Sequence, residues 1–266
     1  MRIAIPKEIK AHEGRVALTP ASCRALIGRG HVVILQTQAG EASGYPDAMY
    51  QQVGVEIAAD AVATYGAGEL ILKVKEPIAP EWPLLRADHR LFSFLHLAAA
   101  PGLVEALCRI GLTAWAFETV REGDHYPLLA PMSRIAGVLA IHQGAHWLQG
   151  VNGGRGILLG RMIGVPRARV VVVGCGQAGL AAIGAAAALD AEVAAFDLKP
   201  AALDAAAALG ANVTALYPDT EMLAAAVAEA DLVVGAVLVP GRRAPAVITE
   251  AMVQRMRPGS VIVDIS

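Results

Sequence analysis

Short apolar runs alternate with segments of helical character along the whole chain. Ten of these runs have the length and the composition of buried strands. They cover residues 2–5, 31–36, 69–74, 91–95, 113–117, 170–173, 192–196, 212–216, 231–234 and 260–265. Helix start signals lie between them, such as Thr19 before Pro20, a hydroxyl cap followed by proline at the first helical position, and Thr249 before a short helix. Such alternation predicts parallel sheets covered by helices on both faces.

The pattern contains two such sheets and therefore predicts two domains. The first series of strands ends near Leu128, after the turn-rich residues 121–125, and a long helical pattern then covers residues 131–149. A glycine-rich turn at 152–156 follows, and the second series begins at Val170. We expect two Rossmann-like, doubly wound α/β domains, residues 1–128 and 129–266, joined by the long helix. Because the chain stops inside the last apolar run, we expect the second domain to be incomplete at its C-terminus.

Composition and charge narrow the class of protein. Of the 266 residues, 55% are hydrophobic and 17% are charged, and the mean hydropathy is +0.50, which excludes a disordered chain. The formal net charge is -2 and no block of like charges occurs. The sequence therefore gives no electrostatic reason to expect a nucleic acid or an anionic membrane as a partner.

One stretch is apolar enough to suggest a membrane span. Residues 170–189 contain one strongly polar side chain, that of Gln177, over 20 positions. A run of valines, a glycine turn and an alanine-rich run nevertheless fit a strand, a turn and a buried helix better. The N-terminus has no signal-peptide pattern, and the three cysteines are too few and too widely spaced for a disulfide framework. We expect a cytoplasmic protein with reduced thiols.

The glycine turn after Val170 has the spacing of a dinucleotide-binding loop. Its sequence, Gly174-Cys175-Gly176-Gln177-Ala178-Gly179, stands between an expected strand and an expected helix. In such loops the three glycines permit a tight turn, the approach of a pyrophosphate and close packing of helix on strand. Asp197, 23 positions after Gly174, ends the next strand, where a carboxylate hydrogen-bonds the ribose hydroxyls of NAD. The spacing predicts an NAD-binding domain at 129–266. The alternatives are a chance glycine turn, or tolerance of a 2′-phosphate through the neighbouring Lys199.

Three candidate site residues follow expected strands of the first domain. Arg15 lies in the loop at 13–20, Lys75 directly follows a strand, and His96 ends another. Ligands of parallel sheets bind beyond the carboxyl ends of the strands, so all three side chains can reach one cleft. Arginine and lysine bind a carboxylate and histidine titrates near neutrality, which suits a small carboxylate substrate that exchanges a proton. The alternative for each is a solvated loop side chain or a hydrogen-bonded core histidine.

His142 and His146 have a spacing that can hold a metal ion on one helix face. The glutamate of the zinc-protease pattern is missing between them, and no cysteine or carboxylate cluster accompanies them. We expect two helix-face histidines and no metal site. The sequence also lacks a serine nucleophile elbow and a phosphate-binding lysine loop.

Seven motifs, in order along the chain, resemble those of the alanine dehydrogenases. They are PKE at 6–8, RVALTP at 15–20, LKVKEP at 72–77, FLHLAA at 94–99, LLAPMS at 128–133, NGGRG at 152–156 and GAVLVPG at 235–241. The resemblance covers the whole chain. It implies reversible, NAD-dependent oxidative deamination of L-alanine to pyruvate and ammonium, with residues 1–128 as the substrate domain. It further implies a homo-oligomer, commonly a hexamer.

The resemblance also implies roles for individual residues. Arg15 and Lys75 hold the substrate carboxylate and carbonyl oxygen. His96 is the proton donor or acceptor, and Lys75 and His96 are the catalytic residues. Hydride transfer belongs to the nicotinamide, whereas the protein supplies orientation and electrostatics. The residues expected to contact the cofactor are Ser133, Gly174, Gly176, Gln177, Ala178, Gly179, Asp197, Val237 and Leu238. We expect the site in a cleft between Lys75, His96 and the glycine turn.

Two departures and two alternatives accompany this resemblance. Alanine dehydrogenases continue past this last strand with an Asp-Gln-Gly-Gly segment and a C-terminal piece, which these 266 residues lack, so we expect poor turnover. The NAD-binding subunit of proton-translocating transhydrogenase is similar around residues 179–185 and 195–197, although it typically lacks the histidine at position 96. A non-catalytic NAD-binding module is the third possibility. An assay with pyruvate, ammonium and NADH separates the first possibility from the other two.

Overall fold

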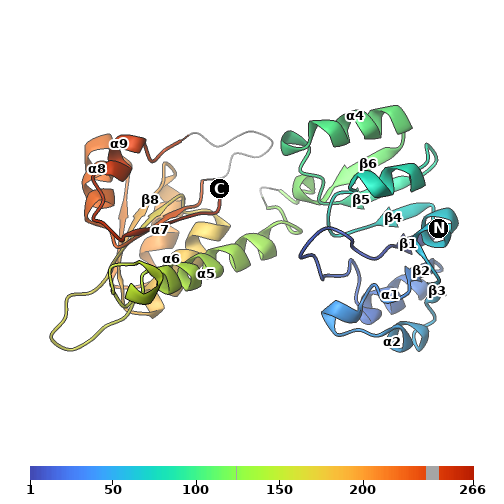
Figure 1. Ribbon diagram of the computed structural model, residues 1–266, viewed down its shortest axis with the longest axis horizontal. Coiled ribbons are helices and arrows are strands. Elements are labelled where there is room, and N and C mark those ends of the chain that lie inside the picture. Colours follow the sequence, from blue (N-terminus) through green and yellow to red (C-terminus); the bar gives the residue numbers. More distant parts are fainter. Residues whose placement is uncertain (124, 238–245) are drawn as a thin grey trace. The chain divides into compact units, whose positions relative to one another are not determined.

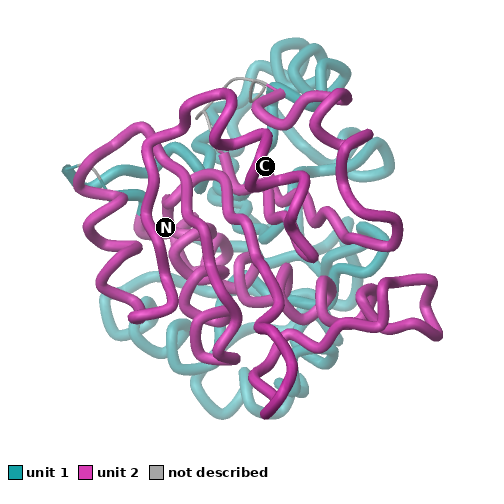
Figure 2. The backbone as a smooth tube through the Cα atoms, turned by 90° about the vertical axis from the view of Figure 1, so that its left-hand side faces the viewer, with its two compact units in different colours: residues 1–126 teal, residues 127–266 magenta. Residues whose placement is uncertain are grey.

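The computed structural model describes residues 1–123, 125–237 and 246–266. The chain forms two compact units, Met1–Tyr126 and Pro127–Ser266, which Figures 1 and 2 show. The sequence placed the domain boundary after Leu128. Each unit is a parallel β-sheet with helices on both faces.

The described residues of the first unit form six parallel strands in the order β3-β2-β1-β4-β5-β6. The strands are β1 (Arg2–Ile5), β2 (Val32–Gln36), β3 (Glu56–Ala58), β4 (Leu70–Leu72), β5 (Arg90–Ser93) and β6 (Thr113–Ala116). The helices are α1 (Pro20–Ile27), α2 (Asp47–Gln51), α3 (Ala61–Ala67) and α4 (Pro101–Ile110), with short 3₁₀-helices η1 (Glu41–Ser43), η2 (Ala79–Leu84), η3 (Leu97–Ala99) and η4 (Phe117–Thr119). The strand order reverses between β1 and β4.

Alternation along β1 explains why both faces of this sheet are covered. Ala4 packs with Tyr65 and Leu91 in one core, whereas the next residue, Ile5, packs with Leu35 and Tyr50 in another. Because successive strand residues point to opposite faces, the consecutive buried residues from Ile3 to Ile5 need helices on both sides of the sheet.

The second unit repeats this architecture with five parallel strands in the order β11-β10-β7-β8-β9. They are β7 (Arg169–Val173), β8 (Glu192–Phe196), β9 (Val213–Leu216), β10 (Leu232–Gly235) and β11 (Val261–Asp264). Its helices are α5 (Ala130–Trp147), the single turn η5 (Gly150–Asn152), α6 (Gln177–Ala188), α7 (Pro200–Ala207), α8 (Thr220–Glu229) and α9 (Glu250–Gln254). Val170 and Val172 face the core beneath α5 and α6, and Val171 and Val173 face the core beneath α8.

The predicted fold class is confirmed, and the differences are local. All ten expected strands occur with ends that differ by up to two residues, and β3 was missed because it spans three residues with no apolar run. The apolar stretch at 170–189 divides into β7, the glycine turn and α6, as expected. Among the described residues, no helix is both long and apolar enough to cross a membrane.

Candidate active site

The carboxyl ends of β1 and β4 meet where the strand order of the first unit reverses. The loop from β1 to α1 carries Glu8 and Arg15, Lys75 follows β4, and His96 follows β5. In doubly wound sheets, ligands bind at this edge, outside the reversal point. The structure of this unit thus places all three predicted site residues at the edge where a substrate is expected.

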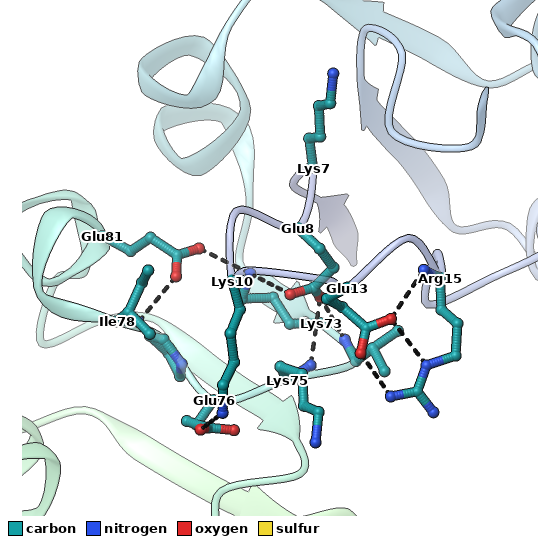
Figure 3. A network of polar contacts seen from close by, with 12 residues as sticks. Lys7, Glu8, Lys10, Glu13, Arg15, Lys73, Lys75, Glu76, Ile78 and Glu81 are labelled. Atoms are coloured by element: carbon teal, nitrogen blue, oxygen red, sulfur yellow. Dashed lines mark hydrogen bonds and ion pairs between the residues drawn. The ribbon is translucent and has the colours of Figure 1, made fainter. Parts of the chain in front are cut away.

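A buried ion network joins the two strand ends (Figure 3). The Lys73 ammonium, whose side chain is 0% exposed, lies 3.0 Å from Glu8 Oε2 and 2.7 Å from Glu81 Oε1. Glu8 Oε1 also accepts the backbone N–H of Val74 at 2.7 Å, and Tyr65 donates its hydroxyl to Glu81 at 2.8 Å. Burial raises the pKa of Tyr65, and the negative charge of Glu81 raises it further. The network therefore fixes the segment before Lys75 against the loop after β1.

A second carboxylate orients Arg15. Glu13 accepts from the backbone N–H, Nε and Nη2 of Arg15 at 2.9, 2.8 and 2.6 Å. These hydrogen bonds lower the pKa of Glu13 and raise that of Arg15. Within the described residues, the other edge of the guanidinium, formed by Nη1 and the second Nη2 hydrogen, has no partner. That edge can grip a carboxylate through two parallel bonds.

Lys75 extends to the same side as Arg15 (Figure 3). Its backbone N–H lies 3.4 Å from Glu8 Oε1, and its ammonium makes no hydrogen bond or ion pair in the described part of the chain. The neighbouring Glu76 is paired with Lys10 instead. Burial alone raises the pKa of Glu76, but the hydrogen bond from Lys10 and the charges of Lys10 and His96 outweigh it, so the net change is downward. Lys75 thus keeps an uncommitted positive charge beside Arg15.

His96 follows β5 in a left-handed backbone conformation, with φ 47° and ψ 40°. Its ring is exposed and stacks on Phe94, with ring centroids 6.2 Å apart. Its backbone N–H donates to Glu118 Oε1 at 2.7 Å. An exposed imidazole on a fixed backbone suits proton exchange with a bound substrate.

Sequence reasoning did not identify the carboxylates and the lysine that hold these residues. Glu13, Lys73, Glu81 and Glu118 were given no role, and Glu8 entered only as part of a motif. One signal was available for Lys73, because a charge inside an apolar strand run requires a buried partner. Its partner Glu8 is 65 positions away in the sequence, so no spacing pattern links them.

The glycine turn of the second unit fits a dinucleotide. Gly174 has φ +97°, and a Cβ there would lie 2.6 Å from the carbonyl oxygen of Ala236. A Cβ at Gly179 would lie 1.7 Å from the carbonyl oxygen of Gly174, so helix α6 packs tightly on the turn. A Cβ at Gly176 would meet nothing within 4 Å. Only glycine fits at 174 and 179, and the space at 176 is open to a ligand's phosphates at the start of α6.

Asp197 lies beside this turn at the end of β8. Its carboxylate accepts the backbone N–H of Cys175 at 2.7 Å and that of Lys199 at 2.9 Å. Burial, together with the charge of Asp197, raises the pKa of the Cys175 thiol to about 12, so this cysteine is unreactive. Asp197 is half-buried and can still accept from ribose hydroxyls.

The remaining cofactor candidates belong to the same unit. Gln177 is exposed at the start of α6 and accepts from Arg134 Nε at 2.9 Å, and Ala178 follows it. Ser133 is half-buried in the first turn of α5, and Val237 is half-buried after β10. Leu238 lies outside the described residues. The cleft expected between Lys75, His96 and the glycine turn stays a prediction.

The two helix-face histidines lie on α5. His142 and His146 are exposed, and the backbone carbonyl of His146 accepts from the side chain of Asn152 at 2.8 Å. In residues 1–123, 125–237 and 246–266, no group of three or more histidine, cysteine, aspartate or glutamate side chains is placed to hold a metal ion.

Comparison with known proteins shows similarity over the whole chain. Two family models match: "Alanine dehydrogenase/PNT, N-terminal domain" over residues 4–136 and "Alanine dehydrogenase/PNT, C-terminal domain" over residues 140–266. The alanine dehydrogenase of Halomonas elongata is 46% identical to this chain, over 100% of this chain and 72% of its own length. That of Bacillus subtilis is 45% identical, over 100% of this chain and 70% of its own length.

Two solved structures match as well. A structure of an L-alanine dehydrogenase has a TM-score of 0.92 at 46% identity, covering 100% of this chain and 74% of its own. A transhydrogenase from Sinorhizobium meliloti has a TM-score of 0.83 at 30% identity, covering 98% of this chain and 77% of its own.

Proposed function

The chain belongs to the alanine dehydrogenase/PNT family, and on this basis we propose that it is an enzyme that interconverts L-alanine with pyruvate and ammonium. The observation that carries the proposal is the meeting of Arg15, Lys75 and His96 at the carboxyl edge of one sheet. Two cations and one imidazole match a 2-oxo acid that must also exchange a proton. The similarity to alanine dehydrogenases, 41–46% identity, exceeds the 30% identity to the transhydrogenase.

The family and its Rossmann-like units imply a nicotinamide cofactor, and we propose that it is NAD. Asp197, at the end of β8 beside the glycine turn, accepts from ribose hydroxyls and repels a 2′-phosphate. Gly176 leaves room for the pyrophosphate at the start of α6. When bound, the nicotinamide accepts a hydride from the alanine Cα, or returns one in the reverse direction.

Arg15 and Lys75 bind the substrate. The edge of the Arg15 guanidinium that faces away from Glu13 takes the carboxylate, because Glu13 occupies Nε and one hydrogen of Nη2. In the amination direction the ammonium of Lys75 lies at the carbonyl oxygen of pyruvate, where it stabilises the negative charge that develops as ammonia adds to the carbonyl carbon. Glu13 holds the guanidinium of Arg15, and Glu8 holds the backbone at Val74 and Lys75, which reduces the entropy lost on binding.

His96 moves the proton. Deamination consumes L-alanine, NAD and water, and yields pyruvate, ammonium, NADH and a proton. A ring nitrogen of His96 takes a proton from the water that adds to the iminium carbon and returns one to the departing ammonia. One imidazole performs both transfers, because its ring nitrogen accepts a proton when neutral and donates it when protonated.

We further propose that the protein acts as a homo-oligomer. Helix α5 exposes large apolar side chains, among them Ile135 at 60%, Leu139 at 49% and Trp147 at 51% of their surface. Exposed large apolar side chains that gather on one helix often mark an interface. Sedimentation of the protein tests this, and a monomer at all concentrations would contradict it.

Steady-state kinetics with pyruvate, ammonium and NADH test the enzymatic proposal. Arg15→Met and Lys75→Met should raise the KM for pyruvate and leave the Kd for NADH unchanged, because both residues lie in the other unit from the glycine turn. Hydride exchange between NADH and an NADP analogue, with no ammonium-dependent activity, would favour the transhydrogenase alternative.

A further inference from the structure

The geometry after β5 points to a positioning residue for the proposed reaction: we infer that Glu118 holds the backbone of His96 and thereby aims its imidazole. The inference rests on the role proposed above for His96. Glu118 is half-buried in η4, directly after β6, which is the neighbour of β5 in the sheet. No motif in the sequence distinguishes it.

Glu118 accepts hydrogen bonds from backbone amides that lie beyond the end of β5 and no longer pair within the sheet. The last strand-like hydrogen bond after β5 runs from the N–H of Phe94 to the carbonyl of Val74. Among the residues that the structure describes, the next two amides have no backbone partner and donate to one carboxylate instead. Glu118 Oε1 accepts from His96 N at 2.7 Å, and both carboxylate oxygens lie 3.2 Å from Leu95 N. Leu95 is buried, so its amide cannot be satisfied by solvent.

The backbone at His96 needs such a restraint. Its φ of 47° is a left-handed conformation that residues with a Cβ adopt at a cost in energy. Conformations of this kind persist where the surroundings hold them in place, and they cluster at functional sites. The bond from His96 N to Glu118 restrains φ directly. Without it, relaxation of φ would turn the Cα–Cβ bond and displace the imidazole.

Phe117, the residue before Glu118, supports the same segment through the packing of its side chain. The ring of Phe117 packs edge-on against Phe92 and Phe94, with centroids 4.3 and 5.1 Å apart, and Phe94 in turn stacks on the His96 ring. Phe117 therefore acts on the rings, whereas Glu118 acts on the amides. A substitution at 118 can remove the backbone restraint and leave the aromatic packing in place.

Three variants test the role of Glu118. Glu118→Ala removes both acceptors, and Glu118→Gln retains an oxygen at Oε1, which accepts from both amides. Thr119→Ala is the matched control, because in the described part of the chain the Thr119 hydroxyl donates to the carbonyl of Ala116, within the same turn, and to no other group. For pyruvate amination we expect Glu118→Ala to lower kcat by roughly 10-fold or more, since small misplacements of reacting groups are costly. The KM for pyruvate should change by less than about threefold, because Arg15 and Lys75 stay in place.

The glutamine variant should keep most of the wild-type kcat, and Thr119→Ala should match the wild type. An unchanged kcat in Glu118→Ala, or equal losses in Glu118→Ala and Thr119→Ala, would overturn the inference. Hydrogen exchange of the Leu95 and His96 amides gives a readout that does not depend on turnover. Both amides should exchange at least about 10-fold faster in Glu118→Ala, and unchanged protection would refute the backbone restraint even in a protein without amination activity.

Discussion

Replacing Gly176 with alanine should weaken NADH binding and leave the fold intact. Gly176 is the N-cap of α6, with φ −74° and ψ −166°, a conformation open to any residue. A Cβ there would meet nothing within 4 Å, whereas at Gly174 and Gly179 it would meet carbonyl oxygens at 2.6 and 1.7 Å. Of these three glycines, Gly176 is therefore the one whose substitution can weaken NADH binding without disrupting the fold.

Two opposing effects set the stability of this variant. Alanine is a poorer N-cap than glycine by roughly 0.5–1 kcal/mol. The loss of backbone freedom in the unfolded chain offsets this by about 0.4–1 kcal/mol, so the free energy of unfolding should change by less than about 1 kcal/mol. The added methyl group occupies space that the phosphates need near the first amides of α6. Losing one hydrogen bond to a charged group, about 1.5–3 kcal/mol, corresponds to roughly 10- to 150-fold weaker binding.

Thermal unfolding and titration with NADH measure the two effects separately. Gly184→Ala is the matched control, because a Cβ at this position within α6 also meets nothing within 4 Å. This control should gain roughly 0.5–1 kcal/mol in stability and bind NADH as the wild type does. Wild-type affinity in Gly176→Ala, or equal weakening in both variants, would refute the placement of the phosphates.

Three further predictions concern the cofactor, the buried network and pH. Asp197→Ala should narrow the preference for NADH over NADPH in calorimetric titrations, and equal affinities in the wild type would contradict the ribose role. Lys73→Met leaves the buried carboxylates of Glu8 and Glu81 without a counter-charge, so urea unfolding should show a loss of about 3–5 kcal/mol. Lys7→Met, whose ammonium contacts the exposed Gln38, should cost less than about 0.5 kcal/mol. Burial lowers the pKa of His89 below 6.5, so the unfolded chain binds this proton first as pH falls, and stability is lost below about pH 6.5. His89→Asn should reduce that loss, and an identical pH dependence in both proteins would count against it.

The fold could be predicted from the sequence because most of its strands are short, continuous apolar runs. The four valines from Val170 alternate between two cores, and the glycines behind them leave few conformations other than a turn into a helix. Strand β3 shows the limit of this reasoning. Its pairing with β2 depends on tertiary contacts, and its three residues, Glu56, Ile57 and Ala58, carry no pattern of their own.

Part of the site could also be predicted from the sequence, because its position depends on where the strands end. The rule that ligands bind at the carboxyl ends of parallel strands singles out Arg15, Lys75 and His96 once the strands are known. The groups that hold them could not be found in this way. Glu118 binds backbone amides 22 and 23 positions away, and backbone amides leave no trace in a residue pattern.

His96 is the group proposed to move the proton when pyruvate is aminated. The most direct measurement follows L-alanine formation and NADH loss together, with pyruvate and ammonium, in the wild type and in His96→Ala. We expect one alanine per NADH consumed, an absolute requirement for ammonium, and a turnover that falls by about 10²–10⁴-fold in His96→Ala while the Kd for NADH is unchanged. NADH consumption without ammonium, or a His96→Ala variant as fast as the wild type, would contradict the claim.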